Sequence, residues 1–504
     1  MKIILLEHPR SITPERCNDI ANTPLSSCLI SGYAAGMLKK CGHDVEIIEG
    51  YLDRLTYGEI ENEIRSIKPD ILGVHMVYHW RQDHELFGFL ENLKDRRLAS
   101  TITAYGFYAT IAADNILKQS TAVDSVISGE TEMTFPALAE AASTGLFTPF
   151  LPGLSVRYQE GIRCTRRRPV KDLDEIPFPV RTEAQYRLPE VNILGSRGCY
   201  GRCTFCYINS FYGTGVPWRG RSPENIASEI AAINAERRAG RFYFTDPNFF
   251  GPGLKGQERA LKIAALLKPM NIFFGIEGRV NDIHDKTIGR LVDAGLRHIL
   301  VGLESGRDES LKRMNKMTTV DQNEQALRVL RRHGIEPNVG FIMFEPDSSL
   351  EDIRINFEFL KRNDLLANLP VTANVLYHHQ IVLEGTEAYH MLKREGRLQL
   401  RDSSYEGNTC LKTPGVAALA NIMRGVTNVL FSRMAAIWSG KIAETPDTRR
   451  QNAEINRILV DTFENCLCQL EAGEQFDDKH IRIMAQNAER EINGSLNKSY
   501  GSDD

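Results

Sequence analysis

The sequence predicts an α/β protein made of an N-terminal Rossmann-like doubly wound parallel sheet, a central partial (β/α)6 TIM-like barrel and a C-terminal helical domain. Short apolar strands alternate with helical segments through residues 1–145, and the alternation resumes through residues 189–378. From residue 379 to residue 504 only helical apolar spacing remains. Residues 146–188 join the two α/β parts as a hairpin and a linker.

The N-terminal part is expected to be a parallel sheet covered by helices on both faces. Its expected strands are residues 2–6, 44–48, 71–77, 102–105 and 125–127, and its first helices are residues 26–40 and 57–68. Such sheets bind ligands at the carboxyl ends of their strands. Aromatic residues and glycines there suit a large flat ligand, and the candidate contacts are Tyr78, His79, Trp80, Gly106, Phe107, Gly129 and Glu130. For each aromatic residue, packing at a domain interface is an equally good alternative.

The joining segment begins with a hairpin, in which residues 154–158 and 162–166 flank a turn at residues 159–161. Pro177 and Pro179 then favour an extended chain, because proline fixes φ and disfavours a helix before it. We therefore expect a linker that leads directly into the barrel.

The barrel prediction depends on six strand signals with helices between them. The strands are expected near residues 191–195, 241–245, 272–276, 298–303, 338–344 and 371–376, and the helices at residues 223–238, 255–268, 282–294, 319–333 and 349–362. Reactive groups of such barrels lie at the carboxyl ends of the strands. The sequence places Asp246, Glu277, Arg279 and Glu304 there. The alternative for each is a surface ion pair or a strand-end cap.

The C-terminal part is expected to hold helices at residues 388–394, 415–438, 447–471 and 477–492. It contains no recognised chemical motif. Residues 494–504 are polar and are expected to fray.

Cys199, Cys203 and Cys206 form a C-x3-C-x-Φ-C triplet, which offers three thiolates from one short loop. A zinc site built from cysteine needs four protein ligands, and no second cysteine pair lies nearby. Three thiolates suit a 4Fe-4S cluster whose fourth iron is left open to a small molecule. Three buried core cysteines are the alternative. The neighbouring Gly198 and Gly201 favour a loop that is approached closely by a ligand.

The composition indicates a cytoplasmic enzyme. The net charge is -4 with acids and bases mixed along the chain, so no field for nucleic acid or an anionic membrane is expected. No run of about 18 apolar residues is present, and the sequence predicts no membrane span and no signal peptide. The cysteines outside the triplet have no framework spacing, which fits reduced thiols. The oligomeric state is left open.

The triplet resembles the signature of the radical S-adenosylmethionine (SAM) family. In that family the open iron chelates the amino and carboxylate groups of SAM, and an electron cleaves SAM to a 5'-deoxyadenosyl radical. The resemblance extends to Val301-Gly-Leu-Glu-Ser305 with Asn315-Lys316, and to Trp218-Arg-Gly-Arg-Ser222. It implies a 4Fe-4S cluster on the three cysteines and contacts to SAM from Phe205, near the adenine, and from Asp246, Glu304, Arg219 and Glu277.

The N-terminal part resembles the cobalamin-binding domain of the cobalamin-dependent radical SAM class. The resemblance is carried by Pro24 with Lys39–Val45, by Lys68–Gly73 and by Asp124–Glu132. Enzymes that ligate cobalt through histidine carry D-x-H-x-x-G after the first strand, whereas this chain has Glu7-His8-Pro9. The resemblance therefore implies a corrin bound without a histidine ligand. Tyr78, His79 and Trp80 would then wall its lower face.

The resemblance implies a radical methyltransferase. One SAM methylates cobalamin, a second yields the radical that abstracts hydrogen, and the methyl group passes from methylcobalamin to an unreactive centre of a small-molecule or peptide substrate. An electron donor such as flavodoxin or ferredoxin is implied as a partner. The first alternative is a cyclase or rearrangement enzyme without methyl transfer, since the domain order is also similar to that of the anaerobic magnesium-protoporphyrin cyclase. A non-catalytic cobalamin-binding sensor is the second, although the intact triplet and Glu304 count against it.

Overall fold

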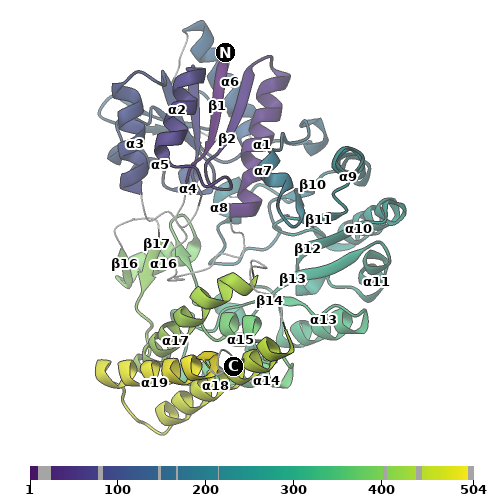
Figure 1. The fold of residues 1–504 in the computed structure, drawn as a ribbon, viewed down its shortest axis with the longest axis vertical. Coiled ribbons are helices and arrows are strands. Elements are labelled where there is room, and N and C mark those ends of the chain that lie inside the picture. Colours follow the sequence, from purple (N-terminus) through teal and green to yellow (C-terminus); the bar gives the residue numbers. More distant parts are fainter. Residues whose placement is uncertain are drawn as a thin grey trace, which may run out of the picture.

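The fold was obtained as a computed structural model, which describes residues 1–9, 24–77, 83–145, 149–165, 169–213, 215–400, 406–438 and 445–497. Figure 1 shows the N-terminal sheet and its helices at one end, the barrel strands in the middle and the C-terminal helices at the other end. The predicted fold class is confirmed.

The N-terminal sheet has seven strands in the order β2-β1-β3-β4-β5-β6-β7. The first five are parallel: β1 (Lys2–Glu7), β2 (Asp44–Glu49), β3 (Ile71–His75), β4 (Thr101–Tyr105) and β5 (Ser125–Ile127). The predicted hairpin, β6 (Leu154–Tyr158) and β7 (Gly161–Cys164), extends this sheet, because β6 pairs antiparallel with β5.

Helices cover both faces of this sheet, as the apolar strands require. In β1, Ile3 and Leu5 join a core with α1 (Pro24–Lys40) and α6 (Thr131–Thr144). Ile4 and Leu6 point the other way and join a core with α2 (Tyr57–Ile67), α3 (Asp83–Asp95) and α5 (Ala113–Gln119). Because successive side chains of a strand alternate between faces, a wholly apolar strand has to be buried on both.

The barrel is an open sheet of five parallel strands in the order β14-β13-β12-β11-β8. The strands are β8 (Val191–Ile193), β11 (Arg241–Phe244), β12 (Phe273–Arg279), β13 (Leu296–Glu304) and β14 (Asn338–Phe341). The predicted helices are present as α9 (Pro223–Arg237), α10 (Gly253–Leu267), α11 (Asp285–Asp293), α13 (Val320–Arg332) and α14 (Leu350–Arg362). Their buried faces and the outward side chains of the strands form one core.

The prediction of a sixth barrel strand at residues 371–376 is wrong. Those residues belong to α15 (Leu369–Val375), which begins with a proline in its first turn. The β-branched residues there favour a strand, but Ala373 and Val375 are buried in the core shared with the C-terminal helices, and this packing outweighs the local preference. A single parallel bridge between Phe344 and His379 stands where the strand was expected.

The C-terminal part contains the predicted helices α16 (Glu387–Arg394), α17 (Pro414–Trp438), α18 (Pro446–Glu471) and α19 (Asp478–Asn497). It also contains a small sheet that was not predicted, of β15 (Val382–Leu383), β17 (Glu406–Thr409) and β16 (Leu398–Leu400). Leu459 and Phe463 of α18 pack into the barrel core, so the helices close the barrel on that side. None of the helices in the described ranges has the length and apolarity to cross a membrane.

Candidate functional site

The three cysteines lie in the loop between β9 (Ser196–Arg197) and α8 (Ile208–Tyr212). All three are free thiols and partly exposed. Gly198 opens the loop with φ +78°, a conformation that glycine adopts at no steric cost. The Gly201 amide donates to Cys199 Sγ over 3.3 Å, and the Cys206 amide donates to the Cys203 carbonyl over 3.2 Å.

The electrostatics of the thiols indicate that they share one space. Burial raises the pKa of Cys206 to about 12, with further contributions from Cys203 and Cys199. Burial also raises the pKa of Cys199. Thiolates in such surroundings need a positive partner, and iron supplies one.

The ligands that the loop offers bear on the kind of metal group it could hold. Within the described residues, no group of three or more His, Cys, Asp or Glu side chains could hold one metal ion. A single ion holds its sulfur ligands about 2.3 Å away, whereas in a four-iron cluster each cysteine binds its own iron. The assignment of the cluster to these three cysteines stays a prediction.

An apolar wall stands behind the cysteine loop and comes from all three parts of the chain. Cys199 and Cys206 pack against a cluster of Tyr207, Ile208, Phe211, Tyr212 and Leu383. Ile30, Phe107 and Ile111 of the N-terminal domain pack against the same cluster. Such a wall limits the access of water to this side of the loop.

Polar contacts fix the other side of the loop. The Tyr200 hydroxyl donates to Asp282 Oδ2 over 2.6 Å, and the Asn248 side-chain amide donates to the same oxygen over 3.0 Å. The Thr204 amide donates to the Met314 carbonyl over 2.9 Å. The loop is thus tied to the carboxyl ends of the barrel strands, where reactive groups of barrels gather.

Arg279 ends β12 and reaches the cysteine loop. Its Nη1 lies 3.5 Å from Cys203 Sγ, and its Nη2 donates to the Lys316 carbonyl. Its Nε donates to Asn281 Oδ1 over 3.3 Å. The sequence places Arg279 among the possible reactive groups at the strand ends, and in the structure its donors contact protein atoms, one of them a cysteine sulfur.

Glu304 ends β13 with φ +64°, which is uncommon for a residue with a side chain and often marks a functional position. Lys316 Nζ donates to Glu304 Oε1 over 2.7 Å, and both side chains are largely buried. Gly302 leaves room for this pair, because a Cβ there would collide with both groups. Burial alone would lower the pKa of Lys316, but Glu304 and Cys203 hold it above its ordinary value. One carboxylate oxygen of Glu304 is thus held by Lys316, whose charge also acts on Cys203, and the SAM contact of Glu304 stays a prediction.

Phe205 packs between the loop and the barrel. It contacts the cluster of Leu311, Met314 and Ile342 and remains partly exposed. Packing of this kind is the alternative to an adenine contact. The adenine contact stays a prediction.

Asp246 and Glu277 face protein groups. The Gly195 amide donates to Asp246 Oδ2 over 2.9 Å, and burial raises the pKa of Asp246 to about 6. The Tyr243 hydroxyl donates to Glu277 Oε1 over 3.1 Å, and burial raises the pKa of Glu277 to about 8. At pH 7 a carboxyl group with a pKa of about 8, such as that of Glu277, is largely neutral and attracts a cation weakly, whereas Asp246 is mostly ionised. The SAM contacts of both residues stay predictions.

Glu130 and Arg219 meet in a buried ion-pair network between the N-terminal domain and the barrel. Glu130 accepts from Arg197 Nη1 over 2.7 Å, from Arg219 Nη1 over 2.9 Å and from the Val170 amide over 3.0 Å. Arg197 Nη2 also donates to Glu132 Oε1 over 2.6 Å. Arg219 of β10 (Arg219–Gly220) lies directly opposite Arg197 of β9. Like charges in this position repel each other, and the carboxylates of Glu130 and Glu132 compensate for the repulsion.

The strand-end residues of the N-terminal sheet lie at the same interface. The Phe107 ring centroid is 5.0 Å from that of Tyr207 and 4.2 Å from that of Phe211. The Gly129 amide donates to Thr110 Oγ1 over 2.8 Å. Gly106 has φ +109°, and a Cβ there would collide with the buried His75 ring. Their cobalamin contacts stay predictions. Tyr78, His79 and Trp80 lie outside the described residues.

The chain is similar to several known proteins. Residues 193–360 match the Radical SAM superfamily, a range that contains the cysteine loop and Glu304. The chain therefore contains a radical SAM domain. An uncharacterized methyltransferase of Pyrococcus horikoshii is 26% identical over 375 residues, which cover 72% of this chain and 79% of that protein. The anaerobic magnesium-protoporphyrin IX monomethyl ester cyclase of Rubrivivax gelatinosus is 24% identical, over 65% of this chain and 61% of that protein.

A solved structure with a similar fold is that of the cobalamin-dependent S-adenosylmethionine radical enzyme OxsB with aqua-cobalamin and S-adenosylmethionine bound. The TM-score is 0.78 at 19% identity, and the match covers 100% of this chain and 82% of that one. This similarity concerns the fold, and it includes the N-terminal domain. The predicted family, its enzymatic nature and its fold are confirmed.

Two residues of this radical SAM enzyme that contact the site had no assigned role in the sequence interpretation. Lys316 was part of a quoted family phrase, and its position twelve residues after Glu304 gave no sign that the two side chains meet. Arg197 lies two residues before the triplet, but only the tertiary structure reveals its partners Glu130 and Glu132.

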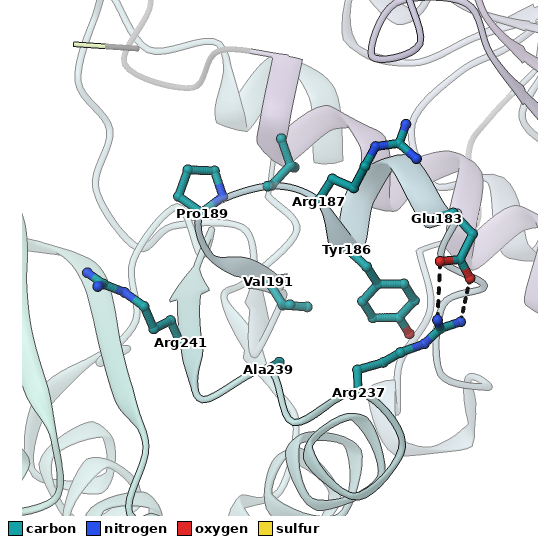
Figure 2. A pocket seen from close by; sticks show the side chains of 9 residues that line it. Glu183, Tyr186, Arg187, Pro189, Val191, Arg237, Ala239 and Arg241 are labelled. Carbon is teal, nitrogen blue, oxygen red and sulfur yellow. Dashed lines mark hydrogen bonds and ion pairs between the residues drawn. The ribbon is translucent and has the colours of Figure 1, made fainter. Parts of the chain in front are cut away.

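A cavity of about 250 Å³ lies away from the cysteine loop of the radical SAM enzyme. Figure 2 shows Tyr186, Val191 and Arg241 along its wall, with Arg237 paired to Glu183. Val191 and Arg241 are the first residues of β8 and β11, so the cavity lies at the amino ends of the strands. In α/β barrels this end serves stability, and the chemistry takes place at the opposite end.

Proposed function

We propose that the protein is a cobalamin-dependent radical SAM methyltransferase that acts on a small-molecule or peptide substrate. The observation that carries the proposal is the loop of Cys199, Cys203 and Cys206 at the carboxyl end of the barrel, packed against the N-terminal domain. Its cofactors are a 4Fe-4S cluster, SAM and cobalamin. When bound, the cluster would pass on the electron that cleaves SAM, and cobalamin would carry the methyl group.

The chain's own residues then have distinct tasks. The three cysteines hold the cluster as thiolates. Glu304 accepts hydrogen bonds from the ribose or the amino group of SAM through the carboxylate that Lys316 orients. The apolar wall of Phe107, Tyr207 and Phe211 keeps water from the loop. A one-electron donor such as flavodoxin or ferredoxin supplies the electron.

A second candidate is a reaction that uses the same cofactors without methyl transfer. The relatives support both, because a methyltransferase and a cyclase match at 26% and 24% identity. The 4'-phospho-dehydrooxetanocin synthase of Priestia megaterium, which is 26% identical over 62% of this chain, is a further relative that is not named as a methyltransferase. Relatives are named for both kinds of reaction, so product analysis is needed to distinguish them.

The deciding experiment measures products from anaerobically reconstituted enzyme. We expect about four irons and four sulfides per chain. With cobalamin, dithionite and SAM, S-adenosylhomocysteine should form in proportion to the bound cobalamin, and cell extract that contains the substrate should add 5'-deoxyadenosine. Deoxyadenosine without S-adenosylhomocysteine would instead favour the cyclase or rearrangement reaction. If neither product forms although both cofactors are bound, the chain is a sensor.

The cobalamin part of the proposal has its own test. Electron paramagnetic resonance (EPR) of the cob(II)alamin form should show no axial nitrogen. His75, at the end of β3, is the described histidine to test, because its Nδ1 lies 2.7 Å from Glu7 Oε1 and its ring stacks on Tyr105, whereas its buried Nε2 has no hydrogen-bond partner among the described residues. A nitrogen superhyperfine triplet that disappears in His75→Gln would make His75 the ligand, whereas one that persists would leave His8 or His79.

A further inference from the structure

The position of Arg279 against the cysteine loop points to a role beyond SAM binding. Nη1 lies 3.5 Å from Cys203 Sγ, a distance that suits an N–H···S hydrogen bond. Contacts to the Lys316 carbonyl and to Asn281 Oδ1 hold the guanidinium in this orientation. The side chain is buried, with 5% of the residue exposed. The positive charge of Arg279 is therefore held beside a sulfur atom, where solvent screens it little.

Two residues of the loop, Gly201 and Tyr200, lie against this guanidinium. A Cβ at Gly201 would collide with Arg279 Nη1, so the glycine makes the approach to the sulfur possible. The guanidinium carbon lies 5.3 Å from the centroid of the Tyr200 ring, within the range of a cation–π contact. The close approach that the glycine pattern indicated is thus made, at Gly201, by an arginine of the chain itself.

Lys316 is a second buried cation at the loop, but it is neutralised by its partner. Its ammonium donates to Glu304 over 2.7 Å, and it acts electrostatically on Cys199, Cys203 and Cys206. Asp282 is the other carboxyl group near Arg279, and it accepts hydrogen bonds from Tyr200 and Asn248, while burial raises its pKa. Of the two cations, Arg279 is therefore the one without a carboxylate in its hydrogen bonds.

We propose that Arg279 raises the reduction potential of the cluster that Cys199, Cys203 and Cys206 hold. Reduction adds one electron, taken from an external one-electron donor, and so adds negative charge at the cysteine sulfurs. Hydrogen bonds to the sulfurs and nearby positive charge stabilise the reduced form more than the oxidised form. Little water surrounds the group to screen this charge. Arg279 is in this account a positioning and tuning residue, not a catalytic one.

The Lys316–Glu304 pair has a balancing role by the same electrostatics. Removal of Lys316 alone leaves the Glu304 charge near the sulfurs and should lower the potential. Removal of the Glu304 charge alone should raise it. Removal of both charges together should leave the potential close to that of the wild type, because the pair is neutral.

The inference depends on the cluster of the proposed function and is tested by a potentiometric titration with dithionite, followed by EPR of the reduced cluster without SAM or substrate. We expect Arg279→Gln to disfavour reduction at least tenfold, which equals about 59 mV for a one-electron couple. Arg279→Lys keeps the positive charge but loses the planar guanidinium group. Its reduction potential should therefore lie between those of Arg279→Gln and the wild type. The reduction potential should decrease in Lys316→Met and increase in Glu304→Gln. It should not change in the double variant.

The outcomes separate the inference from the function. Arg279→Gln with full iron content and an unchanged potential would overturn the inference and leave the cluster assignment intact. If Arg279→Gln loses its cluster, Arg279→Lys and the Lys316 and Glu304 variants decide, because equal potentials throughout that series contradict electrostatic tuning. A wild-type protein that assembles no cluster would instead refute the proposed function itself.

Discussion

Two clusters of buried charge adjoin the cysteine loop, and they use their charges differently. At the domain interface, Arg197 and Arg219 bond Glu130 and Glu132, two cations with two carboxylates. On the barrel side, Arg279 and Lys316 have one direct carboxylate partner, Glu304, and Arg279 contacts a cysteine sulfur instead. The comparison shows that a charged residue at a strand end can already have an oppositely charged partner within the protein. Such a residue indicates a ligand only if it has no such partner.

The two clusters should also differ in their response to substitution. A buried ion pair is costly to break, because the remaining charge has lost both water and its partner. At the interface that cost falls on the association of two domains. At the barrel mouth it falls on the electrostatics around the three cysteines. Four substitutions sharpen or break this distinction, and their expected effects decrease in size from the cysteines to Glu277.

The largest effect is expected for the cysteines themselves. Replacement of Cys199, Cys203 and Cys206 together by alanine should abolish the cluster and the cleavage of SAM, because each thiolate binds one iron. Iron and sulfide analysis after anaerobic reconstitution measures this. The matched control replaces Cys41, Cys164 and Cys410, three of the exposed cysteines among the described residues, by alanine and should keep the full iron content. A complete cluster in the first variant would contradict the site assignment.

The next effect concerns the interface. Glu130→Gln leaves Arg197 and Arg219 with less negative charge in a buried site, which should cost about 3–5 kcal/mol of stability. The melting temperature should fall, and proteolysis of the segment between the domains should become faster. Glu140→Gln on the exposed face of the neighbouring helix α6 is the control and should change neither. Equal behaviour of the two variants would mean that the network contributes little to holding the domains together.

Glu304→Gln tests the barrel side. The substitution keeps the volume but removes the charge-assisted part of a hydrogen bond, worth roughly 1.5–3 kcal/mol. The affinity for SAM should fall by about one to two powers of ten, while cluster and cobalamin are retained. A titration of SAM against the cluster signal in both proteins provides the measurement. An unchanged affinity would make Glu304 a partner for Lys316 alone.

The smallest effect is expected for Glu277 and depends on pH. Its pKa is raised by burial to about 8, so the folded state favours the protonated form. The stabilisation is fully present below the ordinary carboxyl pKa and is lost as the pH rises through 8, by up to about 1.4 kcal/mol per pH unit. Relative to Glu277→Gln, the wild type should therefore lose stability between about pH 6 and pH 8. Parallel pH profiles of the melting temperature would show that Glu277 is ionised in the fold.

The element order was largely predictable, because it depends on local periodicity. The predicted barrel helices and C-terminal helices match their expected ranges closely, and the five N-terminal strands do as well. The exception, residues 371–376, shows where local signals fail. Val371 and Val375 favour a strand, but the segment is a helix that packs on α18, which lies far later in the chain.

By itself, the sequence determined the cysteine triplet, its place after the first barrel strand and the presence of an α/β domain before it. Spacing within a short loop and the period of apolar residues are local properties, so they can be recognised without a fold. The tertiary structure alone decided which charges meet. Glu130 and Arg197 are separated by 67 residues, and Arg279 and Cys203 by 76. The roles of such residues depend on burial and on the partner that the fold brings to them, because a charge removed from water interacts most strongly with its nearest neighbour.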